Sequence, residues 1–212
     1  MNDVALIDNV NATLADDLRE TIRLGDKASV SSGAFSLDAF RKLRETLDKL
    51  AELRFLYNSP DARFENGSSA NLTRPVVARK CAEWVRDKAE FRALRDGVSA
   101  QSFATVGNFA YSPFEGLTPE ALGIEPSAAL AMITKLPAAN VFLERFDPLW
   151  RDDAQSRDVK PAILEKIERL YRDNSPEAIY YIALFHIFKD YLDELSEDVL
   201  PNVATGFKDS KI

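Results

Sequence analysis

The residues best suited to chemistry at neutral pH are scarce in this chain. Its 212 residues include one histidine, His186, and one cysteine, Cys81. Imidazole and thiolate groups carry most hydrolytic and metal chemistry, because their pKa values lie near the working pH or their lone pairs suit a metal. The composition therefore excludes most such mechanisms. It leaves carboxylate or lysine chemistry, or a protein that binds without cutting.

Each of these two residues also has a structural interpretation. His186 follows Ile182 on the same face of an apolar helical segment, which predicts a packed side chain with a hydrogen-bonded nitrogen. Cys81 is predicted to be a half-buried helix residue, although Arg79 and Lys80 beside it could lower the pKa of a reactive thiol.

The carboxylates form two clusters. Asp152 and Asp153 could hold a divalent metal, and Glu194, Glu197 and Asp198 gather near a helix end. Neither cluster has the spacing of a calcium loop or the distant partners of a two-metal site, so we expect solvated charge, with no metal and no cofactor. The sequence also has no glycine-rich phosphate loop, which predicts that this chain hydrolyses no nucleotide.

Charge is unevenly distributed along the chain, whose net charge is −7. Between residues 74 and 95 there are seven basic and three acidic residues, and between 147 and 198 thirteen acidic and seven basic ones. This division permits a nucleic-acid-facing patch on one side. Its candidate residues are Arg74, Arg79, Lys80 and Arg86. The alternative is that these side chains only occupy the solvent-exposed face of a helix.

Neither end of the chain nor its apolar runs indicate a membrane protein. The run at 179–188 is only about half a bilayer span, and the N-terminus lacks the basic start and apolar stretch of a signal peptide. A lone cysteine makes no internal disulfide. We therefore expect a cytoplasmic location and no membrane partner.

The first part of the chain has the pattern of an α/β fold. Helical spacing at 12–24 ends at Gly25, and 27–35 is predicted to be a short strand. Ser36 is a suitable N-terminal cap for the next helix. An apolar strand is predicted after this helix, at 53–57. The order of strand, helix and strand predicts a parallel crossover.

The second part alternates between turn formers and apolar segments. Residues 58–74 are predicted to be a loop, and Pro75 to open a helix that ends near Lys88. We expect strands at 91–94 and 98–106, a glycine- and proline-rich stretch at 107–126, and a strand or helix at 128–134. From Asn140 onward the periodicity is helical throughout. Phe109, Tyr111 and Phe114 either stack on bases or fill the core below their loop.

Several segments resemble the phospholipase D-like domains found at the N-terminus of large superfamily 2 helicases. The opening "ATLADDLRETIRLGDKASVSSGAFSLDAFRKLRETLDKLAELRFLYNSP" follows the family outline, with Gly33, Phe35 and Phe40 in register. "VGNFAYSPFEGL" resembles a family turn, "RFDPLWRD" a family helix, and "ILEKIERLYRDNSPEAIYYIALFHIFKDYL" the helical segment before the motor. The tail "LPNVATGFKDSKI" is similar to the linker that enters the motor. Residues 60–105 match poorly.

The resemblance implies a degenerate catalytic site. The family motif is H-x-K-x4-D, in which the histidine attacks phosphorus and the lysine neutralises the nonbridging oxygens. Along this chain Ser99 and Gln101 stand where the histidine and lysine belong. A serine without a base is a poor nucleophile and an amide carries no charge, so we expect no catalytic residue and a silent nuclease-like centre.

The resemblance also implies the architecture. We expect an α/β fold, a phospholipase D-like sandwich with an all-helical C-terminal appendage: a domain at 1–155, the appendage at 156–199 and a linker or tail at 200–212. An apolar helix in the appendage offers a docking face. Its candidate residues are Tyr180, Leu184, Phe188 and Tyr191.

Three functions remain open after the sequence. The first is a non-catalytic accessory module of a helicase-like protein, with genome defence as one setting, that positions DNA or docks partners. Its partners are then DNA and a motor domain in cis, or another protein. The second is a self-standing interaction subunit or homodimerisation module. The third is an active phosphodiesterase or nuclease with an unrecognised site.

Overall fold

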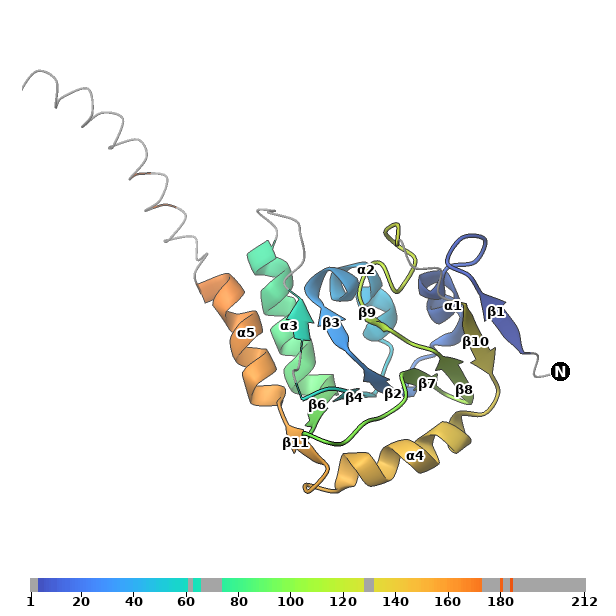
Figure 1. Cartoon of the computed structure of the whole chain (residues 1–212). Coiled ribbons are helices and arrows are strands. Elements are labelled where there is room, and N and C mark those ends of the chain that lie inside the picture. The colour runs from blue at the N-terminus through green and yellow to red at the C-terminus, as the bar shows by residue number, and fades with distance from the viewer. Residues whose placement is uncertain are drawn as a thin grey trace, which may run out of the picture. The chain divides into compact units, whose positions relative to one another are not determined.

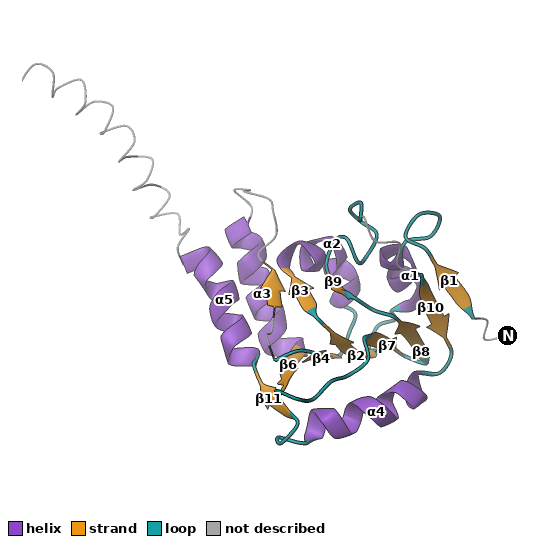
Figure 2. Ribbon diagram, in the orientation of Figure 1, coloured by secondary structure: helices purple, strands orange, loops and turns teal. Residues whose placement is uncertain are grey.

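The computed structural model describes residues 4–60, 63–65, 74–127 and 132–172, together with Tyr180 and Leu184. Residues up to Tyr171 form one compact unit, and those from Arg172 belong to a second. In the first unit, an eight-stranded sheet has helices on both of its faces (Figures 1 and 2). The chain is therefore an α/β protein.

The large sheet is mixed, in the order β1-β10-β8-β7-β2-β4-β6-β11. Its central strands β2, β4 and β6 are parallel, and all other neighbours are antiparallel. The strands are β1 (Ala5–Ile7), β2 (Lys27–Ser32), β4 (Glu52–Tyr57), β6 (Ala89–Leu94), β7 (Phe103–Val106), β8 (Phe109–Ser112), β10 (Ile133–Leu136) and β11 (Ser156–Asp158).

A small parallel sheet, in the order β5-β3-β9, lies beside the large one. It consists of β5 (Arg63–Glu65), β3 (Ala34–Ser36) and β9 (Gly116–Leu117). Gly116 is required there, because a Cβ on this residue would lie 2.9 Å from the carbonyl oxygen of Ala34. The small sheet therefore depends on a residue without a side chain.

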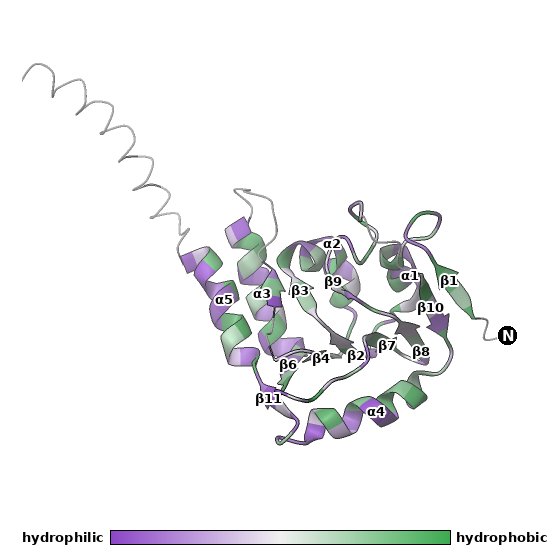
Figure 3. Ribbon diagram, viewed as in Figure 1, coloured by the Kyte–Doolittle hydropathy of each residue, from purple (hydrophilic) through white to green (hydrophobic). Residues whose placement is uncertain are grey.

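Of the five helices whose bounds the structure gives, four cover one face of the large sheet and one covers the other (Figure 1). The first group is α1 (Leu14–Thr21), α2 (Leu37–Leu47), α3 (Arg74–Lys88) and α5 (Lys160–Arg172), and the opposite helix is α4 (Ala139–Arg151). Apolar and hydrophilic residues alternate along these helices at helical spacing (Figure 3). The main core lies under the group of four, and a smaller cluster around Leu56, Phe103 and Phe146 lies under α4.

The predicted crossover is confirmed, since β2, α2 and β4 follow one another and the two strands pair in parallel. Ser36 caps α2 as expected, because its Oγ accepts hydrogen bonds from the backbone N–H groups of Asp38 and Ala39. Gly25 has the positive φ of a chain reversal, 89°, although α1 already ends at Thr21.

Several predicted boundaries are wrong. The expected strand at 27–35 is two strands in different sheets, and the expected loop at 58–74 contains β5. The glycine- and proline-rich stretch contains β8 and β9, while β11 interrupts the expected all-helical end. Apart from β2, these strands have two to four residues, too few for a period of two to appear in a sequence.

The ambiguous segment at 128–134 leads into a strand, β10, since Ile133 to Leu136 pair with β8. The helix predicted to open at Pro75 begins one residue earlier, at Arg74. Helix α5 packs on the main core through Ile163 and Ile167. The division of the chain into functional parts at residues 155 and 199 stays a prediction. Within the described residues, no helix is long and apolar enough to cross a membrane.

Candidate functional site

A cavity of about 530 Å³ lies between the large sheet and α4. Strands β2, β4 and β7 form its floor, α4 forms one wall, and the segment before β7 forms the mouth. Its lining residues are Ser31, Leu56, Ser99, Ala100, Gln101, Phe103, Val141, Phe142, Arg145, Phe146, Pro148 and Leu149. The cavity is therefore mainly apolar, with a few polar groups.

Alternation along β2 makes room for this cavity. Ala28 and Val30 face the main core, so Ser29 and Ser31 face α4 on the other side of the sheet. Serine side chains are small, and they leave space where larger residues would fill the layer below α4. Among the described residues, the buried Oγ of Ser31 has no hydrogen-bond partner.

The structure brings both predicted motif positions to this cavity. Ser99 and Gln101 are exposed residues of its lining, in the irregular segment that precedes β7. The Nε2 atom of Gln101 donates a hydrogen bond of 3.1 Å to Oγ of Ser112, at the end of β8. The segment is thus tied to the neighbouring strand through a neutral side chain.

Arg145 is the single charged residue in the lining of the cavity. It is exposed on α4, and within the described part of the chain it forms no ion pair. Neither Arg145 nor Ser31 was predicted as a site residue. Periodicity shows that α4 has an inner face, but it does not show which strand residues lie opposite that face.

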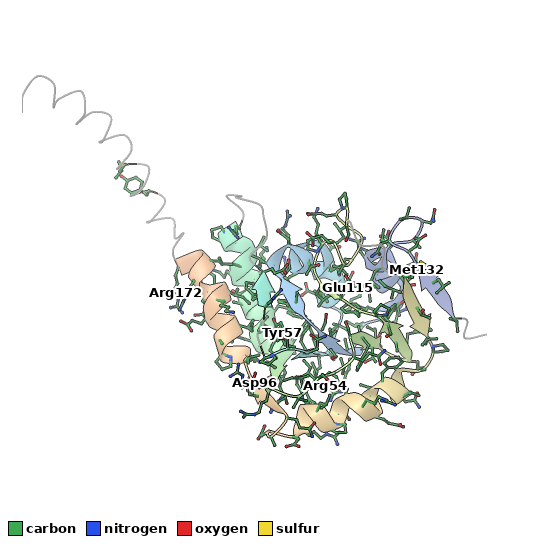
Figure 4. The ribbon with its side chains drawn as sticks, in the orientation of Figure 1. Arg54, Tyr57, Asp96, Glu115, Met132 and Arg172 are labelled. Carbon is green, nitrogen blue, oxygen red and sulfur yellow. The ribbon has the colours of Figure 1, made fainter. Side chains whose placement is uncertain are left out.

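Arg54 fixes α4 to the sheet beside the cavity (Figure 4). Its guanidinium donates to the Asp147 carboxylate at 2.9 Å and to Oγ of Ser29 at 2.9 and 3.2 Å. The same group lies 5.0 Å from the ring centre of Phe146 and 5.8 Å from that of Trp150. These contacts set the height of α4 above the strands.

The residues that line the cavity include no imidazole, thiol or carboxylate in the part of the chain that the structure describes. Covalent phosphoryl or acyl transfer needs a nucleophile beside a general base or next to a charge that lowers its pKa. The lining offers Ser31 and Ser99 no general base, and its one charged residue, Arg145, is exposed on α4. The arrangement suits binding of a partly apolar ligand with an anionic group near Arg145.

The four predicted DNA-binding residues do not form one open patch. Arg86 donates to the Glu168 carboxylate of α5, and the hydroxyl of Tyr171 together with this carboxylate raises the pKa of Arg86. The guanidinium of Arg79 lies 5.7 Å from the ring centre of Tyr171. Both cations therefore contact α5.

The other two candidates lie elsewhere on α3. Lys80 is exposed and has no ion pair within the described residues, and Arg74 is the first residue of the helix. Some of the basic residues that make up the local excess in the sequence thus form contacts within the fold. Whether these four residues bind nucleic acid stays a prediction.

The aromatic residues of 109–114 belong to the core, as the second of the two interpretations has it. Tyr111 and Phe114 are buried in the core, and the partly buried Phe109 packs against it. The interpretation that Tyr111 and Phe114 stack on bases is therefore wrong. The Tyr111 hydroxyl donates to the Asp17 carboxylate at 2.7 Å, and burial raises the pKa of Tyr111. Lys135 bonds the same carboxylate.

The remaining chemical candidates have structural partners or lie outside the described residues. Cys81 is fully buried rather than half-buried, and burial raises the pKa of its thiol, which disfavours a reactive thiolate. Asp153 pairs with Arg92, while hydrogen bonds from Gln155 and from the backbone of Ala154 lower the pKa of Asp152. His186, Glu194, Glu197 and Asp198 lie outside the described residues.

The predicted docking face is described at two positions. Both lie in helical backbone, Tyr180 with 63% of its side chain exposed and Leu184 partly buried. Phe188 and Tyr191 lie outside the described residues. The docking role of these four residues stays a prediction.

Comparisons with known proteins give structural likeness without sequence likeness. No family model matches the chain, and no curated protein matches it. One similar structure is the phosphatidylserine synthase of Haemophilus influenzae Rd KW20, with a TM-score of 0.46, 14% identity and coverage of 94% of this chain and 49% of that one. Another is TrmBL2, an archaeal chromatin protein described with a novel mode of DNA binding, with a TM-score of 0.40, 16% identity and coverage of 69% and 51%. The chain spans about half the length of each.

Proposed function

We propose that this chain is a non-catalytic, phospholipase D-like module that binds DNA or a partner protein within a larger helicase-like protein. One observation carries the proposal: Ser99 and Gln101, which stand at the positions of the family's nucleophilic histidine and its lysine, lie together at the mouth of the cavity below α4. By the family resemblance, a hydroxyl and an amide stand in place of the two catalytic groups, and both line one cavity.

The composition of the cavity favours binding over cleavage. A phosphodiester in it would meet one cation, Arg145, and neutral donors from Ser31, Ser99 and Gln101. Such groups hold an anion, but they supply no group to attack phosphorus or to protonate the leaving oxygen. The module would serve its protein by holding a ligand in place. Genome defence is one setting in which a helicase carries such a module.

The test is hydrolysis by the full chain. Labelled single-stranded and duplex DNA and bis(p-nitrophenyl) phosphate are incubated with the protein, with and without magnesium, and no turnover above the protein-free rate is expected. Ser99→Ala and Gln101→Ala are the matched variants. Turnover that either variant abolishes would overturn the proposal and identify an active phosphodiesterase.

A second candidate function, a homodimerisation module, is favoured by one edge of the large sheet. β1 is the last strand there, and its Leu6 is 62% exposed, with Val4 just before it 60% exposed and Met132 exposed next to its partner strand. An edge strand with apolar side chains is suited to pairing with a second copy. Light scattering at micromolar concentration tests this: a dimer that Leu6→Lys dissociates supports it, and a monomer removes it.

A further inference from the structure

A groove of about 600 Å³ lies between α1 and α2, away from the cavity below α4. Five of its lining residues are basic and one is acidic. The lining residues are Arg19, Arg41, Lys42, Leu43, Arg44, Glu45, Thr46 and Lys49. This basic groove contrasts with the net charge of −7 of the whole chain.

The amphipathic pattern of α2 produces the basic groove. Leu43 and Thr46 are buried, so the residues between and after them point outward on the flank next to α1. Arg19 supplies the other wall, and its Nη2 atom lies 3.4 Å from the carbonyl oxygen of Lys42, which it reaches as a donor. The two helices thus present their cations to the same space.

The basic groove keeps charge that the fold does not neutralise. Each arginine pairs with a carboxylate of its own helix or helix end: Arg19 with Asp16, Arg41 with Asp38, and Arg44 with Asp48. Such pairs at a surface are weak, and a guanidinium has donors left for a second acceptor.

Lys42 and Lys49 differ from these arginines. Within the described residues neither ammonium forms a salt bridge or a side-chain hydrogen bond. Two ammonium groups without a partner, beside three arginines that keep donors for a second acceptor, favour the approach of an anion.

The dimensions of the basic groove favour a phosphate backbone as that anion. From Arg41 to Leu47, where α2 ends, the helix rises about 9 Å at ~1.5 Å per residue. A strand of duplex DNA carries a charge about every 3.4 Å along the axis, so this length faces roughly three phosphates. The only large apolar residue of the lining, Leu43, is buried, whereas a helix that lies on a membrane exposes its apolar face.

We propose that the basic groove between α1 and α2 binds the sugar-phosphate backbone of a nucleic acid, with Lys42 and Lys49 making contacts that other groups in the chain do not replace. This inference rests on the proposed function, and it places the DNA contact on a face different from α3. Contacts of this kind fix position and carry no sequence information.

The experiment is fluorescence anisotropy of the full chain with labelled single-stranded DNA and duplex DNA, over a range of salt from about 50 to 200 mM. Lys42→Ala/Lys49→Ala is expected to lower affinity about tenfold. It is also expected to flatten the slope of log K against log salt by about 1.4 to 1.8, since each lost phosphate contact removes roughly 0.7 to 0.9.

A matched control removes two exposed cations elsewhere, with Arg63→Ala/Arg151→Ala on β5 and α4. Affinity and slope are expected to change little in this variant, and circular dichroism checks that both variants fold. Equal losses in the two double variants would overturn the proposal, because binding would then follow net charge alone.

Two further outcomes count against the basic groove and separate it from the proposed function. If Arg79→Ala/Lys80→Ala abolishes DNA binding while Lys42→Ala/Lys49→Ala does not, DNA binds at α3, and the non-catalytic module stands without the basic groove. If the chain does not bind DNA but binds phosphatidylserine vesicles through Lys42 and Lys49, the ligand is a membrane surface and the proposal is wrong. The hydrolysis assay is a separate measurement, and its result tests only whether the module is non-catalytic.

Discussion

Single side chains hold the candidate cavity in shape, and Arg54 is the clearest case. It lies between the sheet and α4, with less than a third of its side chain and of that of Asp147 exposed. Asp147 also pairs with Arg151, which is mostly exposed. One carboxylate therefore has a partly buried partner and a solvated one, and the two can be compared directly.

Arg54→Ala is expected to lower the free energy of unfolding by about 2 kcal/mol, less than the ~3 to 5 kcal/mol of a fully buried pair because solvent screens the contact. The loss arises because Asp147 and the hydroxyl of Ser29 lose their partly buried donor. Arg151→Ala is the control, with an expected loss of at most about 0.5 kcal/mol. Urea unfolding measures both, and equal losses would mean that burial of Arg54 contributes nothing.

The candidate site was predictable from the sequence only where a pattern named its residues. Ser99 and Gln101 were found because a family motif gives an order along the chain. Ser31 and Arg145 belong to the same cavity, but they come from β2 and α4, more than a hundred residues apart. Only the packing of α4 on the sheet brings them together. The cations of α2 were missed for another reason, since carboxylates interleave with them in the sequence and hide the local excess.

At the scale of elements, α3 and α5 show which contacts a count of charges along the sequence leaves out. The basic excess at 74–95 suggested a binding face, but Arg79 and Arg86 contact Tyr171 and Glu168 of α5. Acidic residues of the later segment thus balance basic residues of the earlier one. Longer elements such as α2 and α3 were predicted well, because their periodicity extends over several turns. The short strands β5, β9 and β11 were not, because distant neighbours define them.

Arg86→Ala is expected to loosen α5 without altering DNA binding. Loss of the contacts with Glu168 and Tyr171 should lower the free energy of unfolding by about 0.5 to 1 kcal/mol, a small value because Arg86 is more than a third exposed. Lys80→Ala, one helix turn and a half away, should leave stability unchanged. Thermal unfolding measures stability and anisotropy measures binding. A lower salt slope in Arg86→Ala with normal stability would return the DNA contact to α3.

At the scale of the whole molecule, the packing indicates where the compact unit ends. The main core contains Val159, Ile163 and Ile167, and β11 forms the edge of the large sheet next to β6. All of these lie beyond residue 155, the predicted end of the α/β domain. The core cluster has no member beyond Ile167 among the described residues, and Tyr171 packs partly against it. The predicted boundary at residue 155 came with the architecture that the family resemblance implies, and a helical pattern after it does not reveal which core the next helix covers.

Two truncations turn this packing into a measurement. A chain of residues 1–172 keeps the whole core and both sheets, so it is expected to unfold in one cooperative transition, with a free energy of unfolding within about 1 kcal/mol of the full chain. A chain of residues 1–155 loses β11 and exposes the surface that Ile163 and Ile167 cover. Removing each buried isoleucine side chain costs about 2 to 5 kcal/mol, which is comparable to the whole stability of a domain, so this chain is expected to be unfolded or molten. Far-ultraviolet circular dichroism in urea distinguishes the two. If residues 1–155 unfold as cooperatively as residues 1–172, α5 is an appendage, as the sequence suggested, and its contacts with α3 add little to the fold.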